Sequence, residues 1–260
     1  MDNIKSLCDS SAVSCGKNYT LLSSVDSTNN YIKKLSDVLP DGHIVIANEQ
    51  LSGRGRQGKS FYSPAGEGLY MSILVKNPAN VSDELFTARI SLAVCRAIDR
   101  LTGTDNNSGV GIKWVNDIYF GKKKLCGILC ERFVSEKGNT FVVAGIGVNI
   151  NLASAEIPKE LRSIVTSLHD ITRTSYDKLE LCSLICEEFE KIFEVSDTDA
   201  MNEYKKRSVV IGREIRILRE DGDLRAAALD ILDDGSLLVR TEEGYTQKLC
   251  GGEISIKLKK

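Results

Sequence analysis

The sequence predicts an α+β protein, in which a mixed sheet with packed helices precedes a small β-barrel. Three observations support this class. Short β-like runs and amphipathic helical patterns follow one another irregularly as far as residue 207. From Gly212 to Leu258 the helical periodicity disappears, and turn signals separate β-rich runs about every ten residues. A content of 42% apolar and 27% charged residues is typical of a globular protein with a sizeable core.

Apolar, β-branched runs predict seven short strands before residue 151. The run from Leu69 to Lys76 is apolar enough to be largely buried on both faces. The predicted strands are Leu21–Val25, Ile44–Glu49, Leu69–Lys76, Gly111–Val115, Ile118–Phe120, Leu125–Arg132 and Phe141–Ile150.

Apolar residues spaced three or four apart predict four helices. The first follows Asp26-Ser27-Thr28-Asn29, whose side chains suit a helix N-terminus. The second begins at Ser82, a favourable cap, and ends at Gly103. The third and fourth cover residues 176–193 and 199–207. The residues that define the apolar faces are Tyr31, Ile32 and Leu35; Ile90, Val94, Ile98 and Leu101; and Leu181, Ile185, Phe189 and Ile192.

The change of periodicity places a domain boundary near residues 206–211. We therefore expect a poorly ordered polar segment over 1–20, a main domain over 21–207 and a small β domain over 208–260. The chain carries 34 Lys and Arg against 36 Asp and Glu, a net charge of −2. No global positive field exists to attract nucleic acid, so anion recognition must come from local clusters.

Cysteine usage and hydropathy point to the cytoplasm. The chain has eight cysteines but no C-x-x-C spacing, and it has two histidines, too few for a His-rich metal site. Buried reduced thiols of a cytoplasmic protein are the expected state. No apolar run approaches the roughly 18 residues that a membrane span needs, and no signal peptide is visible.

Residues 53–60 read Gly-Arg-Gly-Arg-Gln-Gly-Lys-Ser and match two phosphate-binding patterns, G-x-G-x-x-G and G-x-x-x-x-G-K-[ST]. Both need a helix directly after the loop, because the helix N-terminus binds the phosphate. Residues 61–68 contain one Pro and two Gly, so no helix is predicted there. A nucleotide P-loop and a dinucleotide fold are therefore disfavoured.

The loop from Gln50 to Gly68 is still a candidate for binding an anion. Its glycines permit close backbone approach, and Arg54, Arg56 and Lys59 place three positive charges within six residues. These residues alone are explained equally well by a solvated basic loop and by a clamp that closes over an anionic ligand.

Two further segments carry polar side chains between apolar runs. Lys113-Trp114-Val115-Asn116-Asp117 combines a lysine, an amide and a carboxylate, and Lys124 begins the strand that follows. Gly145-Ile-Gly-Val-Asn149 ends an apolar strand with two glycines and an amide. Taken singly, these residues are explained more simply as surface lysines, turns, strand ends and, for Trp114, core.

Together the segments resemble the biotin–protein ligases. Seven segments agree with that family in order and spacing, from residue 21 to the C-terminus. They are Ser27-Thr28-Asn29, Gly53-Arg-Gly-Arg-Gln-Gly58, Ser63-Pro64, Lys113-Trp-Val-Asn-Asp117, Lys124-Leu-Cys-Gly-Ile128, Gly145-Ile-Gly-Val-Asn149 and Gly251-Gly-Glu-Ile-Ser255. Each is weak to moderate evidence alone, but seven in order are highly specific. The resemblance implies a class II synthetase-like catalytic domain over 21–207 and an SH3-like barrel over 208–260.

The resemblance implies a two-step reaction with biotin and ATP as substrates and Mg²⁺ as the metal ion. The biotin carboxylate attacks the α-phosphate of ATP, giving biotinyl-5′-AMP and pyrophosphate. A lysine of a biotin carboxyl carrier protein or domain then attacks this mixed anhydride and releases AMP. Only about 20 residues precede the first strand, too few for a helix-turn-helix domain, so no DNA target is expected. A homodimer is compatible with the sequence, which does not indicate the oligomeric state.

The resemblance also implies roles for individual residues. Lys113, Asp117 and Arg56 are the catalytic candidates, and Asp117 serves either Mg²⁺ or the incoming lysine ammonium. Those matching positions around biotin are Ser27, Thr28, Asn29, Gln50, Gly53, Arg54, Arg56, Lys124 and Gly127. Those matching positions around ATP or the adenylate are Arg54, Arg56, Phe61, Lys113, Asn116 and Asn149.

Three positions depart from the family pattern. Val115 replaces a common Pro, Phe61 replaces a Trp that packs over adenine, and Gln57 replaces a further Arg, which makes the loop less basic. Lipoate–protein ligase is the close rival, but its Arg-Arg…Gly-Gly-Gly segment is missing from this sequence. A DNA-binding regulator and a ligand-binding protein without catalysis are two further hypotheses, each from a different functional class.

Overall fold

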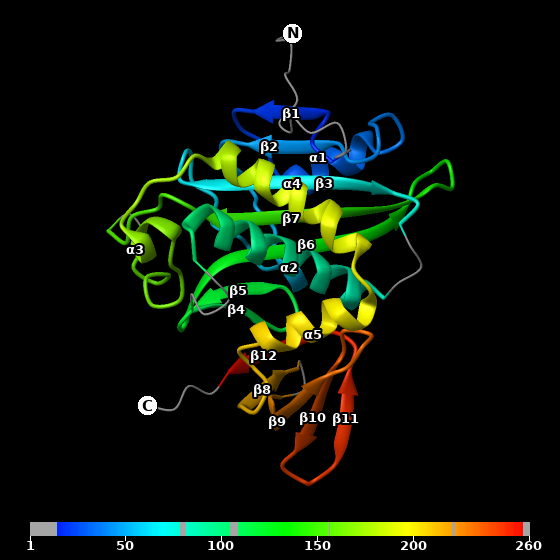
Figure 1. Cartoon of the computed structure of the whole chain (residues 1–260), viewed down its shortest axis with the longest axis vertical. Coiled ribbons are helices and arrows are strands. Elements are labelled where there is room, and N and C mark those ends of the chain that lie inside the picture. The colour runs from blue at the N-terminus through cyan, green and yellow to red at the C-terminus, as the bar shows by residue number, and fades with distance from the viewer. Residues whose placement is uncertain (1–14, 79–81, 105–108, 156, 220–221, 257–260) are drawn as a thin grey trace.

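The computed structural model describes residues 15–78, 82–104, 109–155, 157–219 and 222–256 (Figure 1). A seven-stranded sheet forms the larger part of the molecule, and a five-stranded sheet forms its C-terminal part. Helices pack on the large sheet, so the predicted α+β class is confirmed. The first 14 residues of the predicted N-terminal segment lie outside the described part of the chain.

The large sheet has the strand order β1-β2-β3-β7-β6-β5-β4. Its strands are β1 (Tyr19–Leu22), β2 (Ile44–Ala47), β3 (Gly68–Lys76), β4 (Val110–Lys113), β5 (Asp117–Phe120), β6 (Lys123–Val134) and β7 (Thr140–Asn149). The pair β1–β2 is parallel and the other pairs are antiparallel, which makes the sheet mixed, as predicted. β1 lies earlier than the predicted strand Leu21–Val25, because Val25 pairs with Gln50 only as an isolated bridge.

Both faces of the large sheet are covered by helices. The helices of the described residues are α1 (Thr28–Leu35), α2 (Asp83–Thr102), α3 (Leu168–Thr172), α4 (Lys178–Glu194) and α5 (Asp197–Arg207), together with the 3₁₀ turn η1 (Arg56–Gly58). The residues of β2 alternate between the two faces. Val45 packs with Ile32 of α1 on one face, whereas Ile44 and Ile46 belong to the main core, which α2 and α4 cover.

The structure confirms the predicted ends of α2 and contradicts the predicted capping of α1. Ser82 accepts a hydrogen bond from the Leu85 N–H at 3.1 Å, and Gly103 is left-handed at φ 65°, as their sequence signals predict. Ser27 precedes α1, but its side chain makes no capping hydrogen bond with the described residues. Thr28 and Asn29 are buried instead of capping the helix, so the predicted capping role of this segment is wrong.

The C-terminal sheet is antiparallel, with the order β11-β10-β9-β8-β12. Its strands are β8 (Glu214–Leu218), β9 (Leu224–Ile231), β10 (Leu237–Thr241), β11 (Thr246–Leu249) and β12 (Glu253–Ile256). The turn signals Asp234-Gly235 and Glu243-Gly244 lie between strands, as predicted. α5 lies between the two sheets and contacts β4 of one and β9 of the other (Figure 1).

The seven cysteines in the described part of the chain are free thiols, and five of them are buried. This finding agrees with the expectation of reduced structural thiols. None of the described helices is both long enough and apolar enough to cross a membrane.

Arg89 of α2 fixes the point where α4 ends and α5 begins. Its side chain is buried, donates to the carbonyl groups of Ile192 and Val195, and pairs with Asp197. A buried carbonyl that loses its donor retains the full cost of desolvation. Arg89 therefore supplies hydrogen bonds that the C-terminal end of α4 cannot make for itself.

Replacing Arg89 by Met should lower the free energy of unfolding by about 2–4 kcal/mol, because two carbonyl groups lose a buried donor. Arg100→Met on the same helix is the matched control. Arg100 is more exposed and pairs with Glu187 and Glu188, so its loss should cost at most about 1 kcal/mol. Urea denaturation followed by circular dichroism gives both values. Equal losses for the two variants would show that Arg89 does not anchor α4.

Candidate active site

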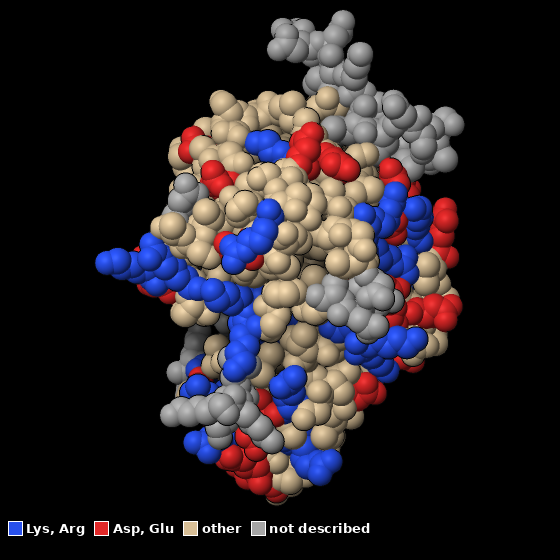
Figure 2. Space-filling view, turned by 60° about the vertical axis from the view of Figure 1, so that its left-hand side comes forward, with Lys and Arg blue, Asp and Glu red and all other residues tan. Residues whose placement is uncertain are grey.

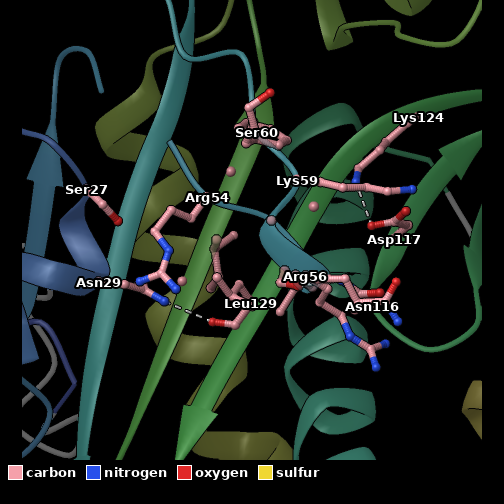
Figure 3. Close-up of a pocket in the computed structure, with 18 of the residues that line it drawn as sticks. Ser27, Asn29, Arg54, Arg56, Lys59, Ser60, Asn116, Asp117, Lys124 and Leu129 are labelled. Atoms are coloured by element: carbon pink, nitrogen blue, oxygen red, sulfur yellow. Dashed lines mark hydrogen bonds and ion pairs between the residues drawn. The ribbon is translucent and has the colours of Figure 1, made fainter. Parts of the chain in front are cut away.

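One pocket gathers residues from segments that lie far apart in the sequence (Figure 3). α1, the loop before β3, the β4–β5 connection and strands β6 and β7 all contribute to it. The predicted site residues that line it are Ser27, Thr28, Asn29, Gln50, Arg54, Arg56, Phe61, Lys113, Asn116, Asp117, Lys124 and Gly127. Gly53 and Asn149 lie outside the described lining.

The glycine-rich loop forms a small hairpin over this pocket. Arg54 and Ser60 pair as an antiparallel bridge, and the Gly55 N–H donates to the Lys59 carbonyl at 2.7 Å. No helix follows in the described residues 60–67, so the phosphate site of a P-loop is not built here. Gly53 lies at the base of the hairpin, where an added Cβ atom would come within 2.5 Å of the Phe61 carbonyl oxygen.

The two arginines of the loop point to opposite ends of the pocket. Arg54 turns toward α1, where Nη1 donates to Asn30 at 2.9 Å and Nη2 lies 3.6 Å from Glu131. Figure 3 shows its guanidinium beside Asn29, whereas the side chain of Arg56 extends past Asn116. The loop therefore offers a charge at each end of the pocket.

Positive charge dominates the lining. The cationic side chains are Arg54, Arg56, Lys59, Lys113 and Lys124, and among the described lining residues Asp117 is the one carboxylate. Lys124 Nζ lies 2.7 Å from Asp117 Oδ1. Figure 2 shows that basic and acidic side chains form several separate groups on the face that it presents. The pocket is therefore a local positive field that suits an anionic ligand.

Aromatic rings accompany two of these lysines. Lys113 Nζ lies 5.6 Å from the centroid of the Tyr119 ring, and Lys124 Nζ lies 5.8 Å from that of Phe61. An added Cβ atom on Gly147 would come within 2.5 Å of the Phe61 ring, and one on Gly127 within 3.2 Å. The space above these two glycines is therefore occupied by Phe61, where the family resemblance implies close approach of a ligand to Gly127.

A chain of hydrogen bonds fixes the neutral polar residues at the α1 end. Gln50 Oε1 accepts from the Thr28 N–H at 3.0 Å, and Gln50 Nε2 donates to Ser63 at 3.0 Å. Ser72 donates to Asn29 Oδ1 at 2.6 Å, and Asn29 Nδ2 donates to the Leu129 carbonyl at 3.2 Å. These bonds connect α1 to β3 and β6, so this wall of the pocket is held rigidly.

Glu131 completes this wall from β6. It accepts from Asn29 at 2.8 Å, pairs with Lys33 and faces Arg54. Burial opposes ionisation of the carboxyl group, but the hydrogen bonds from Lys33 and Asn29 outweigh it and lower the pKa of Glu131. The ionised carboxylate balances the two cations that stand beside the pocket.

The amides predicted to lie near adenine occupy different positions. Asn116 lines the pocket, and its Nδ2 donates to the Ile128 carbonyl at 2.6 Å. Asn149 is buried, and its Nδ2 donates to the Thr166 carbonyl at 3.0 Å. The bond to Thr166 uses one N–H of the Asn149 amide, so a ligand contact would have to use the other N–H or the oxygen.

Several lining residues escaped prediction. Met71, Leu129 and Ile146 belong to apolar strands, where the sequence signal of a pocket wall and of a core residue is the same. Gly252 and Ile254 come from the C-terminal sheet. Both residues belong to the motif Gly251–Ser255, which the sequence analysis identified. The motif alone did not indicate that the C-terminal sheet reaches the pocket.

Two family models match the chain. The biotin/lipoate A/B protein ligase family matches residues 21–151, and the biotin protein ligase C-terminal domain matches residues 210–257. The bifunctional ligase/repressor BirA of Bacillus spizizenii is 32% identical over 223 residues, which are 84% of this chain and 67% of that protein. The biotin–[acetyl-CoA-carboxylase] ligase of Mycobacterium tuberculosis is 31% identical over 221 residues, 82% of this chain and 79% of that protein.

A solved structure agrees over almost the whole chain. The biotin protein ligase of Aquifex aeolicus in complex with biotin and ATP superimposes with a TM-score of 0.79 and 28% identity, covering 93% of this chain and 99% of that one. The two family matches, the relatives and the shared fold therefore agree that the chain belongs to the biotin protein ligase family.

Proposed function

We propose that this protein uses ATP to activate biotin as biotinyl-5′-AMP and then transfers the biotinyl group to a lysine of a biotin carboxyl carrier domain. The observation that carries this proposal is the composition of one pocket. Neutral hydrogen-bonding residues gather at its α1 end, where Arg54 is the one cation of the described lining and faces Glu131, whereas the other cationic side chains gather around the loop and the β4–β5 connection. A neutral ureido ring beside a carboxylate and a polyphosphate fits this division of polarity.

The first step needs positive charge where two anions approach each other. The biotin carboxylate forms a bond to the α-phosphorus, and the bond from that phosphorus to the bridging oxygen of pyrophosphate breaks. In the proposal Lys113 stabilises charge that develops on the α-phosphate, and Lys124 faces the carboxylate. Asp117 holds Lys124 at 2.7 Å and so orients it.

The neutral end of the pocket is proposed to bind biotin. Ser27, Thr28 and Gln50 stand beside the position given to the ureido ring, with Gln50 held by Thr28 and Ser63. Asn29 acts through its bonds to the strands, because both of its amide hydrogens reach protein acceptors. Gly53 supports the loop. Phe61 is proposed to move from above Gly127 and to pack against the adenylate.

The second step needs a neutral lysine amine. Its nitrogen attacks the acyl carbon of the adenylate, the bond to the phosphate oxygen breaks, AMP leaves, and the nitrogen loses a proton. Asp117 is the carboxylate of the described lining that can receive the incoming ammonium group. The ordered loop is proposed to keep water from the mixed anhydride until the lysine arrives.

Mg²⁺ is proposed to enter with ATP. Within the described residues no group of three or more His, Cys, Asp or Glu side chains can hold a metal ion. Mg²⁺ prefers phosphate oxygens, water and one or two carboxylates, and Asp117 can supply one of these. The ion would neutralise charge on the departing pyrophosphate.

The acceptor, the compartment and the other partners belong to the proposal as well. The acceptor is a biotin carboxyl carrier protein or a carrier domain of a biotin-dependent carboxylase. The free buried thiols favour a cytoplasmic location. We propose no DNA target, and the proposal is the same for a monomer and for a homodimer.

Purified protein with biotin, Mg·ATP and a carrier domain should add one biotinyl group to that domain, because the pocket is proposed to bind both the acyl group and the nucleotide. Intact-mass spectrometry measures the addition. The control is a carrier domain whose acceptor lysine is replaced by Arg, which should gain no mass. Preferential transfer of lipoate over biotin would instead assign the protein to the lipoate ligases.

Arg56→Gly should release biotinyl-5′-AMP about 10- to 100-fold faster than the parent, because a charge-assisted contact to phosphate typically contributes about 1.5–3 kcal/mol. The adenylate should still form, since Lys113 remains. Released adenylate should then label bystander lysines. Rapid filtration with radiolabelled biotin measures the release rate.

Arg54→Gly is the matched variant, because it adds the same flexibility to the same hairpin. Arg54 is bound to Asn30 and faces Glu131, so its loss should raise the release rate less than that of Arg56. If both variants release the adenylate at the same rate as the parent, the loop does not clamp the intermediate.

A further inference from the structure

The β4–β5 connection, residues 113–117, carries two charged groups of the pocket and is held from several sides. The first contact is a hydrogen bond to the large sheet, in which Asn116 Nδ2 donates to the Ile128 carbonyl at 2.6 Å. A second comes from α5, where the buried hydroxyl group of Tyr204 donates to the Val115 carbonyl at 2.9 Å. These two bonds fix the connection at Val115 and Asn116. A third contact holds its beginning, next to Lys113.

That third contact comes from the C-terminal sheet. Trp114 Nε1 donates to the carbonyl oxygen of Gly235 at 2.8 Å, in the turn between β9 and β10. The indole ring is 4% exposed and the hydrogen bond is buried. A buried N–H donor that loses its acceptor is costly, so this bond fixes the orientation of the ring. Trp114 follows Lys113 directly in the chain. Fixing the indole ring therefore also fixes the backbone position from which the Lys113 side chain extends.

The turn that carries Gly235 is itself docked on the N-terminus of α2. Ser82 donates to the Asp234 carbonyl at 2.7 Å. Gly235 has φ +82°, and an added Cβ atom would come within 2.9 Å of the backbone carbon of Glu84 and the backbone nitrogen of Leu85. The backbone of the β9–β10 turn therefore packs directly against the backbone of α2. A shift of the turn would break its contact with α2 or its hydrogen bond with Trp114.

The same sheet reaches the pocket a second time. Gly252 and Ile254, at the β12 end, line the pocket directly. Arg56 Nη2 lies 3.9 Å from the position of a Cβ atom on Gly251. The C-terminal part thus contacts the β4–β5 connection and also lies beside the arginine of the loop.

We propose that Trp114 is a positioning residue, which transmits the docking of the β9–β10 turn to Lys113 and Asp117. This inference rests on the proposed function. Loss of the docking should lower kcat for adenylation, because a small displacement of a charged group reduces its effect on the transition state. The KM for biotin should change little, because the neutral wall is held by α1, β3 and β6.

Two glycines of the C-terminal sheet provide a matched test. Gly235 and Gly244 are both left-handed, at φ +82° and +89°, and both lie in turns of this sheet. No described atom lies within 4 Å of a Cβ atom built on Gly244. Both Ala variants place a side chain on a left-handed residue, but only Gly235→Ala also brings a Cβ atom against α2.

Gly235→Ala should lower kcat for biotin-dependent adenylation at least about tenfold, with the KM for biotin within about twofold of the parent. Gly244→Ala should keep both parameters within about twofold of the parent. Trp114→Phe, which keeps an aromatic ring and removes the donor, should show the same split as Gly235→Ala. Equal effects of the two glycine variants, or unchanged kcat in Trp114→Phe, would overturn the inference.

Fluorescence gives a readout that does not depend on turnover. Trp114 is the one tryptophan of the sequence, so the emission of the protein reports its environment. Gly235→Ala should shift the emission to longer wavelength and increase quenching by acrylamide, and Gly244→Ala should leave both unchanged. Unchanged emission in Gly235→Ala would overturn the docking. A parent protein that makes no adenylate would overturn the proposed function, while the emission would still decide whether the turn is docked on Trp114.

Discussion

The main physical constraint on this structure is the repulsion among five cationic side chains around one pocket. The described lining of that pocket contains one carboxylate. Like charges that are held close together repel one another. The protein limits this repulsion by placing carboxylates or an aromatic ring beside the cations. Asp117 pairs with Lys124, Glu131 faces Arg54, and the Tyr119 ring lies near Lys113. The site keeps a net positive field that an adenylate or a polyphosphate would neutralise. In the proposed reaction, binding and catalysis depend on the same feature, because the charges that attract ATP would also stabilise the transfer at its α-phosphate.

Rigid elements carry these charges. The large sheet supplies the floor, and the bonds of Asn29 to Leu129 and Glu131 connect α1 to β6 across it. The β4–β5 connection is held by β6, by α5 and by the C-terminal sheet. The loop with Arg54 and Arg56 is held by its own hairpin bonds. The pocket therefore combines walls that are fixed before a ligand enters with a loop that we propose closes afterwards.

Periodicity predicted α2 and α4, because long amphipathic patterns have one interpretation. Short apolar, β-branched runs predicted the strands of the large sheet, although β1 lies earlier than expected. It missed α3, whose five residues are too short to show a period and which Ser167 caps locally. The ordered motifs predicted most of the pocket, since each is local in sequence. They did not predict the bond from Trp114 to Gly235, because the two residues are 121 positions apart and neither type signals the other. Nor did they reveal that Asn149 uses its amide on Thr166, since an amide has the same sequence signal whichever partner it finds.

The cationic pocket itself is proposed to make the adenylate, and every later step depends on this one. Biotin-dependent exchange of labelled pyrophosphate into ATP tests it most directly, because exchange reports the first step without an acceptor protein. We expect exchange in the parent only when biotin is present, and a rate about 10²- to 10³-fold lower in Lys113→Ala with biotin binding nearly unchanged. Exchange without biotin, or Lys113→Ala turnover within a few-fold of the parent, would contradict this role of the pocket.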